Sequence, residues 1–432
     1  MSGELIALLA FGALFGLMIL RVPIGIAMIM VGFGGFGTMI AFDPALNILG
    51  QAPIRTATDE VFGVIPLFIL MGTFATNSGL SQELYKASHA WVGHRRGGLA
   101  LATIFASGGF AAICGSSVAS AATLGKVALP EMLRYGYRPS FASGTIASGG
   151  TLGILIPPSI VLAVYGILTE QDIARLFIAG LVPGLLAIAL YAGVIAVLTR
   201  LKPEIAPASG QFDLREAIRS LAGIWAVVLL FVFVIGGIYV GFFTPTEAAA
   251  MGAGGTLIIG ILRGRLTLSS TLASLKEATR LTGAIFIIAI GAVIFGYFLT
   301  VTRAPQNFAN YVGDLPWSPG TVLLIIILGY VVLGMFLDSL AIILLTVPIM
   351  LPVIRELGYD PIWFGILLVM VVEIGLISPP YGMNVFVLKS VAPDLRLGEI
   401  YAGVTPFIAV DMIRVILIVL FPIIVLYLPN SM

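Results

Sequence analysis

Apolar residues run through almost the whole chain in blocks of about twenty, separated by short polar segments. A helix of about twenty residues crosses the roughly 30 Å hydrocarbon core of a bilayer, so each such block predicts a transmembrane helix. Because no separating segment is long enough for a soluble domain, we expect an all-α polytopic membrane protein. The predicted crossings cover residues 5–20, 22–42, 62–80, 140–168, 173–199, 217–242, 244–262, 282–302, 360–389 and 400–428.

Four further segments do not fit a single crossing. The stretches 98–134 and 319–356 are apolar but do not read as one simple membrane helix. The segments 45–60 and 265–281 mix charged and apolar residues at helical spacing, which predicts helices that lie in the membrane interface. The hydrophobic pattern alone leaves the path of the two apolar stretches open.

The composition supports a membrane location and removes several classes of function. Of the 432 residues, 59% are hydrophobic and 10% are charged, whereas a soluble domain carries about 25% charged residues. The formal net charge of +1 gives no bulk attraction for nucleic acid. One cysteine and two histidines exclude an internal disulfide and a structural zinc site. Because the chain lacks the phosphate-binding Gly-x-x-x-x-Gly-Lys-Ser/Thr motif, we expect an ion gradient to supply the energy.

Basic residues mark the cytoplasmic loops and thereby define the path of the two apolar stretches. Lys and Arg accumulate in short loops that stay in the cytoplasm. A pair of arginines precedes the stretch 98–134, and Arg134 and Arg138 follow it, so both of its ends should be cytoplasmic. Neither flank of 319–356 is net basic, which places both of its ends outside. We therefore predict two re-entrant helical hairpins that enter the membrane from opposite faces.

The two hairpin regions repeat each other at a constant offset of 222 residues. Ser117 and Ala119 at the first tip match Ser339 and Ala341 at the second. A constant offset without gaps, combined with opposite orientation, indicates an inverted repeat. The further matches are Leu129, Pro130, Gly136, Tyr137, Pro139, Gly153, Pro157 and Pro158 with Leu351, Pro352, Gly358, Tyr359, Pro361, Gly375, Pro379 and Pro380.

Inverted repeats with broken helices are typical of secondary transporters, which bind substrate and ions near the middle of the membrane. The tandem prolines at 157–158 and 379–380 remove backbone donors within two predicted crossings, and nearby glycines let the chain open. Exposed carbonyls are tolerated there when they line a cavity. We expect N-terminal scaffold helices with an interfacial arm at 1–61, a first repeat at 62–199, linking and scaffold helices with a second arm at 200–281, and a second repeat at 282–432.

Polar side chains at the tips and breaks are candidate ligands. Asp338 and Glu373 lie in apolar stretches, where a charge costs at least about 2.5–3.5 kcal/mol unless it is paired or hydrated. Each is either a cation ligand or a buried carboxyl that is protonated or paired with an arginine. Ser116 and Ser117 either cap the second hairpin helix or bind an ion, and the two roles are compatible. Asn384 is either a ligand or a partner in an interhelical hydrogen bond.

The remaining reactive side chains suit structural roles. His89 and His94 lie beside a basic loop and are expected at the membrane interface. Cys114 has no catalytic partner near it in the sequence and is expected to pack as a small apolar residue. The alternative of a membrane-embedded enzyme lacks the acidic and histidine clusters that hydrolytic or metal chemistry requires. We therefore expect no enzymatic activity.

The motifs around the first hairpin resemble those of a known transporter family. The resemblance is carried by Gly98-Leu-Ala-Leu-Ala, Gly115-Ser-Ser-Val-Ala-Ser-Ala-Ala-Thr-Leu-Gly125, Leu129-Pro130-Glu131-Met132, Gly136-Tyr137 and Ile156-Pro-Pro-Ser159. With these residues the chain resembles the large membrane (M) subunit of tripartite ATP-independent periplasmic (TRAP) transporters, which belong to the ion-transporter superfamily. The resemblance covers essentially the whole chain and is strongest in the two hairpin regions.

The resemblance implies a multi-pass protein of the bacterial inner membrane that uses Na+ to import an organic acid anion, such as sialic acid or a C4-dicarboxylate. It implies an elevator-type arrangement, in which a transport domain that holds both hairpins slides against a scaffold. The implied partners are a small four-helix membrane (Q) subunit, a periplasmic substrate-binding (P) protein and the surrounding phospholipid. No nucleotide or organic cofactor is expected.

The resemblance also assigns residues to sites by their motif positions. One sodium site would combine Ser116, Ser117, Gly149, Gly150, Thr151 and Gly153. The other would combine Asp338, Ser339, Glu373, Gly375, Ser378 and Asn384. The substrate would lie between the tips and contact Ser116, Ser117, Thr151, Pro157, Pro158, Ser339, Pro379, Pro380 and Asn384. A self-sufficient sodium symporter of the same superfamily remains the alternative, and the sequence does not distinguish dicarboxylates, sugar acids and other organic anions.

Overall fold

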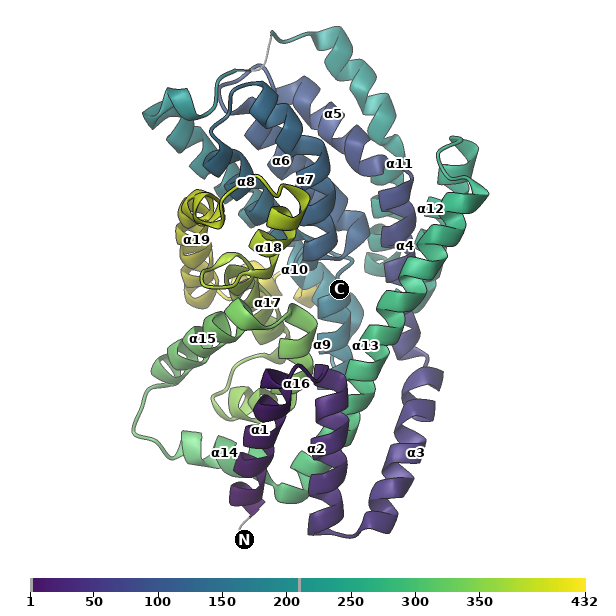
Figure 1. The fold of residues 1–432 in the computed structure, drawn as a ribbon, viewed down its shortest axis with the longest axis vertical. Helices are drawn as coiled ribbons and strands as arrows, with labels where there is room; N and C mark the ends of the chain where they lie inside the picture. The colour runs from purple at the N-terminus through teal and green to yellow at the C-terminus, as the bar shows by residue number, and fades with distance from the viewer. Residues whose placement is uncertain (1–2, 209–210) are drawn as a thin grey trace.

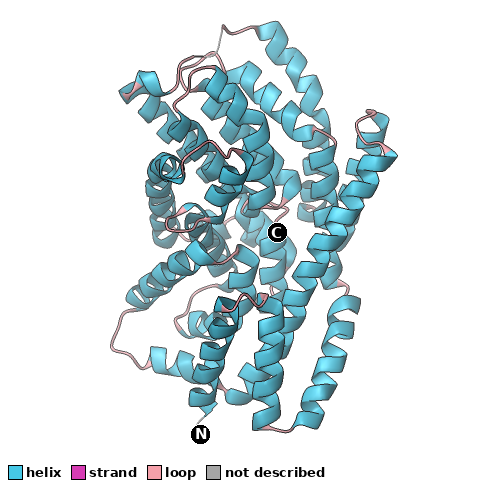
Figure 2. Cartoon of the chain, viewed as in Figure 1, coloured by secondary structure: helices cyan, strands magenta, loops and turns pink. Residues whose placement is uncertain are grey.

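The computed structural model describes residues 3–208 and 211–432, and this part of the chain is helical, with no strand (Figure 2). Seven of the described helices are long and apolar enough to cross a membrane, or eight if the bent pair α3 and α4 forms one crossing. The prediction of an all-α polytopic protein is confirmed. The helices are α1 (Gly3–Ile19), α2 (Ile24–Met39), α3 (Phe42–Thr58), α4 (Val64–Asn77), α5 (Leu80–Val92), α6 (Gly98–Cys114), α7 (Ser117–Arg134), α8 (Pro139–Thr151), α9 (Ile160–Thr169), α10 (Ile173–Leu201), α11 (Leu214–Tyr239), α12 (Pro245–Leu262), α13 (Leu268–Thr302), α14 (Ala304–Gly313), α15 (Pro319–Phe336), α16 (Ser339–Glu356), α17 (Pro361–Ile377), α18 (Met383–Val391), α19 (Leu397–Leu420) and α20 (Ile423–Leu426).

The helices of the second half follow those of the first at the offset that the sequence indicates. Helices α7 and α16 have both their first and their last residues 222 positions apart. Helices α8 and α17 begin 222 positions apart, and α2 with α12 and α5 with α14 match within two residues. The correspondence therefore extends beyond the hairpins into helices near the N-terminus, where no sequence match had indicated it.

Both predicted hairpins are present, and each turns at a residue suited to the turn. In the first hairpin, α6 ends before Gly115, whose φ of 62° lies in the left-handed region that favours glycine. The side chain of Ser116 then caps α7. In the second hairpin, Leu337 is extended and the Asp338 side chain caps α16. The tips are therefore defined by local backbone and capping chemistry.

Both predicted broken helices are also present. The first consists of α8, a 3-10 turn at Leu152–Ile154 and α9, and the second of α17 and α18. The chain between each pair contains the tandem prolines, and the Pro157–Pro158 and Pro379–Pro380 bonds are both cis. Because proline lacks a backbone donor and clashes with the preceding turn, neither segment continues as an α-helix.

The structure corrects the prediction for residues 265–302. An interfacial helix at 265–281 and a separate crossing at 282–302 were expected, but α13 is one uninterrupted helix. Its sequence contains no proline, and Thr267 and Ser270 form a capping box at its start, so nothing ends the helix between the two predicted segments. The equivalent helices α3 and α4 in the first half are instead bent by 61°. The last predicted crossing, 400–428, is likewise interrupted after α19, next to Pro422.

Two groups of helices pack against each other. In the first group, α2 packs on α13 and α4 packs on α12. The second group contains the hairpins and the broken helices, with α8 against α19 and α15 against α17. Figure 1 shows α12 and α13 along one side of the molecule and α17, α18 and α19 on the other. The expected division into a scaffold and a transport domain stays a prediction.

Small residues bring the helices into close contact within and between the two groups. A Cβ on Gly32 of α2 would lie 2.8 Å from the backbone of Phe295 in α13. Between the groups, a Cβ on Gly72 of α4 would lie 2.8 Å from the carbonyl oxygen of Cys114 at the first tip. Glycine is required at both positions because the backbones touch. The first hairpin tip therefore rests directly on α4.

Candidate functional site

A cavity of about 510 Å³ lies between the tips of the two hairpins and the helices α4 and α13. The first tip contributes Ser116 and Ser117, and the second contributes Asp338 and Ser339. Because α7 and α16 begin at these tips, the positive ends of both helix dipoles face the cavity. Residues from the two halves of the repeat therefore share one cavity.

Ser117 and Asn384 join the two halves beside this cavity. The Nδ2 atom of Asn384, on α18, donates to Ser117 Oγ at 2.7 Å and to the carbonyl oxygen of Ala147 at 3.2 Å. Ser117 Oγ also lies 3.0 Å from Asn384 Oδ1. Both side chains are buried. Asn384 was expected in the second sodium site, but in the structure its amide is engaged with Ser117 at the first tip.

The first break packs tightly onto the first tip. A Cβ on Gly153 would lie 2.5 Å from the carbonyl oxygen of Ser116 and 2.8 Å from Ser120 Oγ. A Cβ on Gly150 would lie 2.7 Å from the Cβ of Ala121. Only glycine allows this approach, which brings the tip carbonyl against the opened backbone.

Two buried hydroxyls lack a partner, one of them at this contact and the other on α8. Ser120 Oγ on α7 and Ser148 Oγ on α8 are fully buried and make no hydrogen bond within the described residues. Buried polar groups are normally satisfied, so each unpaired hydroxyl requires an explanation, such as a bound ion or water. Neither serine was singled out from the sequence.

The second tip is built differently. Asp338 Oδ1 accepts hydrogen bonds from the backbone nitrogens of Leu340 at 3.0 Å and Ala341 at 3.1 Å. Asp338 and Ser339 are only half-buried. Gly375, the equivalent of Gly153, contacts Gly334 in the body of α15: a Cβ on Gly334 would lie 3.0 Å from the Cα of Gly375. The second tip is therefore less closed than the first.

Two other residues expected at the second sodium site have partners of their own. Ser378 Oγ donates to the carbonyl oxygen of Ile374 at 2.7 Å, as serine does at the end of a helix. Glu373 Oε2 accepts a hydrogen bond of 2.7 Å from Arg414 Nη2. The sequence left open whether Glu373 is a cation ligand or a buried carboxyl that is protonated or paired with an arginine. In the structure Glu373 is paired with Arg414.

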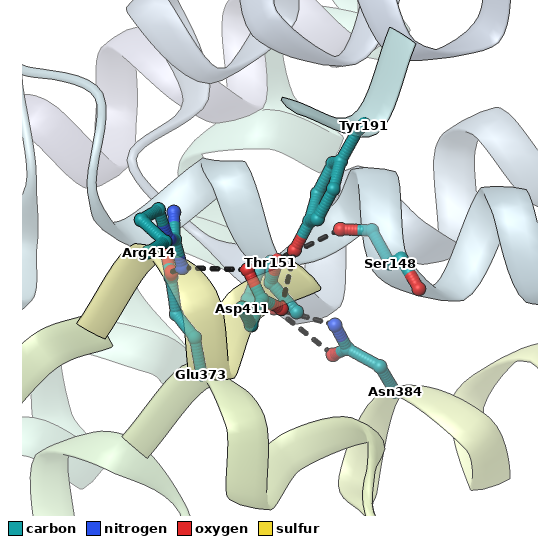
Figure 3. Close-up of polar contacts among 8 residues, drawn as sticks. Ser148, Thr151, Tyr191, Glu373, Asn384, Asp411 and Arg414 are labelled. Atoms are coloured by element: carbon teal, nitrogen blue, oxygen red, sulfur yellow. Dashed lines mark hydrogen bonds and ion pairs between the residues drawn. The ribbon is translucent and has the colours of Figure 1, made fainter. Parts of the chain in front are cut away.

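The Glu373 ion pair belongs to a fully buried network that links the two halves (Figure 3). Arg414 Nη2 also lies 3.0 Å from Asp411 Oδ1. Tyr191 donates to Asp411 Oδ2 at 2.7 Å, and its hydroxyl lies 3.3 Å from Thr151 Oγ1. The network therefore runs from α17 through α19 and α10 to the end of α8.

The remaining predicted substrate contacts do not line the cavity. Thr151 Oγ1 donates to the carbonyl oxygen of Ser148 and faces the buried network. Pro157 and Pro158 are buried, whereas Pro379 and Pro380 are exposed outside the cavity. Of the nine predicted substrate residues, only Ser116, Ser117 and Ser339 line the cavity.

The cavity contains two charged residues that were not predicted. Lys126 of α7 and Glu277 of α13 both line it and are exposed to it. Neither makes an ion pair or a hydrogen bond with another described residue. Lys126 is the first charged residue within the apolar hairpin 98–134, where a charge is a visible signal. Asp411 and Arg414 form an i, i+3 pair inside a predicted crossing and could have been found in the same way.

A family profile matches nearly the whole chain. The family is described as "Tripartite ATP-independent periplasmic transporter, DctM component", and the match covers residues 11–424.

Two curated relatives match over most of their length. The chain is 39% identical to the C4-dicarboxylate TRAP transporter large permease protein DctM of Pseudomonas aeruginosa, over 93% of this chain and 93% of that protein. It is 31% identical to the sialic acid TRAP transporter large permease protein SiaM of Vibrio cholerae, over 97% and 98% of the two chains. The names of these two relatives state different substrates.

A solved structure shares the fold. The YdaH transporter of Alcanivorax borkumensis, described as having an unusual topology, matches with a TM-score of 0.61 and 15% identity, over 85% of this chain and 88% of that one. At this identity the likeness concerns the architecture alone.

Proposed function

The chain belongs to the DctM family of tripartite ATP-independent periplasmic transporters, and from this premise we propose that it imports an organic acid anion across the bacterial inner membrane by cotransport with Na+. The observation that carries the proposal is the single cavity between the two hairpin tips, where two helix N-termini meet a carboxylate and several hydroxyls. Helix N-termini favour anions, and oxygen ligands favour hard cations. One cavity thus offers both chemistries.

The first sodium site is proposed at the contact between the first tip and the first break. The unpaired hydroxyl of Ser120 supplies an oxygen ligand there, next to the Ser116 carbonyl that faces Gly153. The unpaired hydroxyl of Ser148 on α8 is proposed as a further ligand. Of the predicted ligands, Ser116, Gly150 and Gly153 take part in this contact. Ser117 is bonded to Asn384, Gly149 faces Ser107 on α6, and Thr151 is directed to Tyr191. A cation at this position would satisfy two buried oxygens that otherwise have no partner.

The second sodium site is proposed around Asp338 and Ser339. One oxygen of Asp338 caps α16, which leaves the other free for a cation. Gly375 and Ser378 remain candidate ligands through their carbonyls, whereas Glu373 and Asn384 already have other partners. Because this tip is less closed than the first, binding of a cation there is expected to draw the tip toward the second break.

The charges of the cavity support cotransport with cations. Of the described residues that line it, one is a lysine and two are acids, Glu277 and Asp338, so the lining carries a net charge of −1. An organic anion is repelled by this charge and by the inside-negative potential, which opposes its entry by about 2.3 kcal/mol per charge per 100 mV. Sodium ions that enter with the substrate offset both the repulsion by the cavity charge and the cost of the membrane potential.

An elevator movement is proposed for the passage across the membrane. The cavity lies at the boundary between the two helix groups, with the tips on one side and α4 and α13 on the other. Glu83 of α5, which precedes the first hairpin, forms a bidentate ion pair with Arg263 at the end of α12, at 2.7 and 2.9 Å. This ion pair connects the helix that precedes the first hairpin to the end of α12 in the other helix group.

The cavity extends toward the predicted cytoplasmic side. Lys126 lies about 13 Å along α7 from Ser117, in the direction of the basic loop that begins at Arg134. Glu277 lies near the start of α13, close in sequence to Arg263 and Arg265. We therefore assign this conformation to the inward-facing state.

A periplasmic substrate-binding protein and a small membrane subunit are proposed as partners, as in the tripartite systems of the relatives. The test is uptake of labelled organic acids into proteoliposomes that contain this chain, its small membrane subunit and its binding protein. The proposal predicts uptake only with an inward sodium gradient, and loss of uptake when either partner is omitted. Uptake that is unchanged without the gradient contradicts sodium coupling. Uptake by the chain alone would instead identify a self-sufficient symporter.

A further inference from the structure

Lys126 and Glu277 carry opposite charges and face the same cavity. Lys126 belongs to the first hairpin and Glu277 to α13 of the other helix group, and both line the cavity between the tips. Both side chains are exposed, and neither forms an ion pair or a hydrogen bond with another described residue. Because the two helix groups are proposed to slide past each other, we compared the levels of the two residues along the membrane normal.

The contacts of α4 define the level of Glu277. Phe62, which precedes α4, packs edge-on against Phe286 of α13, with 6.1 Å between the ring centroids. Asn77 at the end of α4 donates to Ser274 near the start of α13 at 2.7 Å. The two helices are therefore antiparallel. Glu277, three residues beyond Ser274, lies about 4–5 Å from that contact, in the direction away from the predicted cytoplasmic side.

Lys126 lies closer to the predicted cytoplasmic side. A Cβ on Gly72 of α4 would lie 2.8 Å from the carbonyl oxygen of Cys114, so the first tip is level with Gly72. Gly72 precedes Asn77 by five residues, which places the tip about 7–8 Å from the Asn77 contact and about 3 Å from the level of Glu277. From the tip, α7 runs toward the basic loop, and Lys126 lies about 13 Å along it. The backbones of Lys126 and Glu277 are therefore offset by roughly 10 Å.

We propose that Lys126 and Glu277 form an ion pair in the outward-facing state and thereby close the cytoplasmic side of the cavity. A movement of the hairpin group by about 10 Å toward the outside brings the two residues level. This inference rests on the proposed elevator movement and specifies how one of its end states is held. In the inward-facing state both charges are solvated, and their attraction becomes stronger as closure removes water from between them.

The ion pair acts at one end of the cavity. In the repeat, the residue 222 positions after Lys126 is Pro348, which carries no charge. The second hairpin therefore has no matching lysine that could close the outer side in the same way. The pair thus favours the outward-facing state over the inward-facing one.

The first test is a disulfide between the two positions. A disulfide requires Cβ atoms about 3.5–4.5 Å apart, which the offset in the inward-facing state excludes. The chain carries Cys114→Ala, because Cys114 is its one cysteine, and is placed in proteoliposomes with both partners. Lys126→Cys with Glu277→Cys is expected to cross-link under mild oxidation, and the cross-link should stop uptake until it is reduced.

Lys126→Cys with Lys276→Cys is the matched control for the cross-link. Lys276 is exposed on α13 next to Glu277 in the sequence but does not line the cavity. This second pair is expected not to cross-link, because its α13 position faces away from the hairpin.

The second test exchanges the charges. Lys126→Glu and Glu277→Lys are each expected to lower the rate of sodium-driven uptake at least about fivefold, because like charges then meet in the outward-facing state. The double variant Lys126→Glu with Glu277→Lys restores the pair and should recover most of the rate. A general effect of the cavity charge on the substrate would instead move the two single variants in opposite directions. If a charge variant does not fold, the cysteine pair still decides.

Two results overturn the inference: a cysteine pair that does not cross-link, or a double charge exchange that is no faster than the slower single variant. In either case sodium-driven uptake by the wild type would leave the proposed function intact. If the wild type shows no sodium-driven uptake, the proposed function itself fails, while the cross-link still reports whether the two positions meet.

Discussion

Arg414 donates a hydrogen bond of 2.7 Å to Glu373, and the side chains of both residues are fully buried. Arg414 also contacts Asp411, so one guanidinium is shared between two carboxylates. Asp411 in turn accepts a hydrogen bond from Tyr191, which lies beside Thr151 at the first break. The charge pair thus holds the second broken helix and the first break in a fixed relation.

Replacing Arg414 with methionine is expected to destabilise the protein strongly. The change leaves two buried carboxylates without a counter-charge, which costs about 3–5 kcal/mol. The thermal unfolding temperature in detergent should fall strongly for Arg414→Met. Arg175→Met removes an exposed contact with Asn430 and should change this temperature little. Adding Glu373→Gln and Asp411→Asn to Arg414→Met should recover most of the loss. An unaltered unfolding temperature for Arg414→Met alone would show that the network does not hold the two halves together.

Replacing Asn384 with alanine is expected to lower both stability and uptake. The substitution leaves Ser117 Oγ and the Ala147 carbonyl without their partner, at a cost of about 1–3 kcal/mol for buried groups. Both the thermal unfolding temperature and the rate of sodium-driven uptake should fall. Asn310→Ala, in an exposed position on α14, serves as the control. If Asn384→Ala has the same unfolding temperature and uptake as Asn310→Ala, Asn384 does not join the two halves at a functional site.

Replacing Ser148 with alanine is expected to weaken sodium binding without unfolding the protein. Ser148 Oγ has no hydrogen bond to lose within the described residues, so the change removes only a proposed ion ligand. The sodium concentration that gives half-maximal uptake should rise several-fold, roughly the effect of 1 kcal/mol. Ser143→Ala is matched to it, because Ser143 is also buried on α8 but donates to the Ser140 carbonyl. If both variants keep the wild-type sodium dependence, Ser148 is not a ligand.

Replacing Gly153 with alanine is expected to separate the first tip from the first break. The added Cβ would lie 2.5 Å from the Ser116 carbonyl oxygen, so the backbones must move apart, at a cost of about 1–3 kcal/mol. Sodium-stimulated uptake should fall together with the stability. Gly193→Ala is the control, because a Cβ at Gly193 meets open space. Retention of wild-type sodium dependence in Gly153→Ala would contradict the first proposed site.

The sequence predicted the architecture because each feature has a local signal. The hairpins followed from arginines at both ends of 98–134, and the broken helices followed from tandem prolines. The constant offset of 222 residues then paired the two halves. The continuous helix α13 was missed because charged residues such as Glu277 indicated an interface, although no helix-ending signal separates them from the apolar half.

The site could be predicted only in part, because side-chain direction depends on how the helices pack. The tip residues Ser116, Ser117, Asp338 and Ser339 were identified, since capping and hairpin turns are local. The partner of Asn384 was not identified, because Ser117 lies 267 residues away in the chain.

The central claim is that the second tip binds a sodium ion through Asp338, and one comparison tests it directly. Asp338 and Asp360 have the same capping role, since Asp360 Oδ1 accepts from the backbone nitrogens of Ile362 and Trp363 at 2.8 and 3.0 Å. Asparagine caps a helix about as well as aspartate but removes the charge. Asp360 does not line the cavity.

The measurement is the sodium dependence of uptake by Asp338→Asn and Asp360→Asn in proteoliposomes with both partners. The account predicts that Asp338→Asn raises the sodium concentration for half-maximal uptake by at least about tenfold, or abolishes uptake, while Asp360→Asn behaves as wild type. Wild-type sodium dependence in Asp338→Asn would contradict the account.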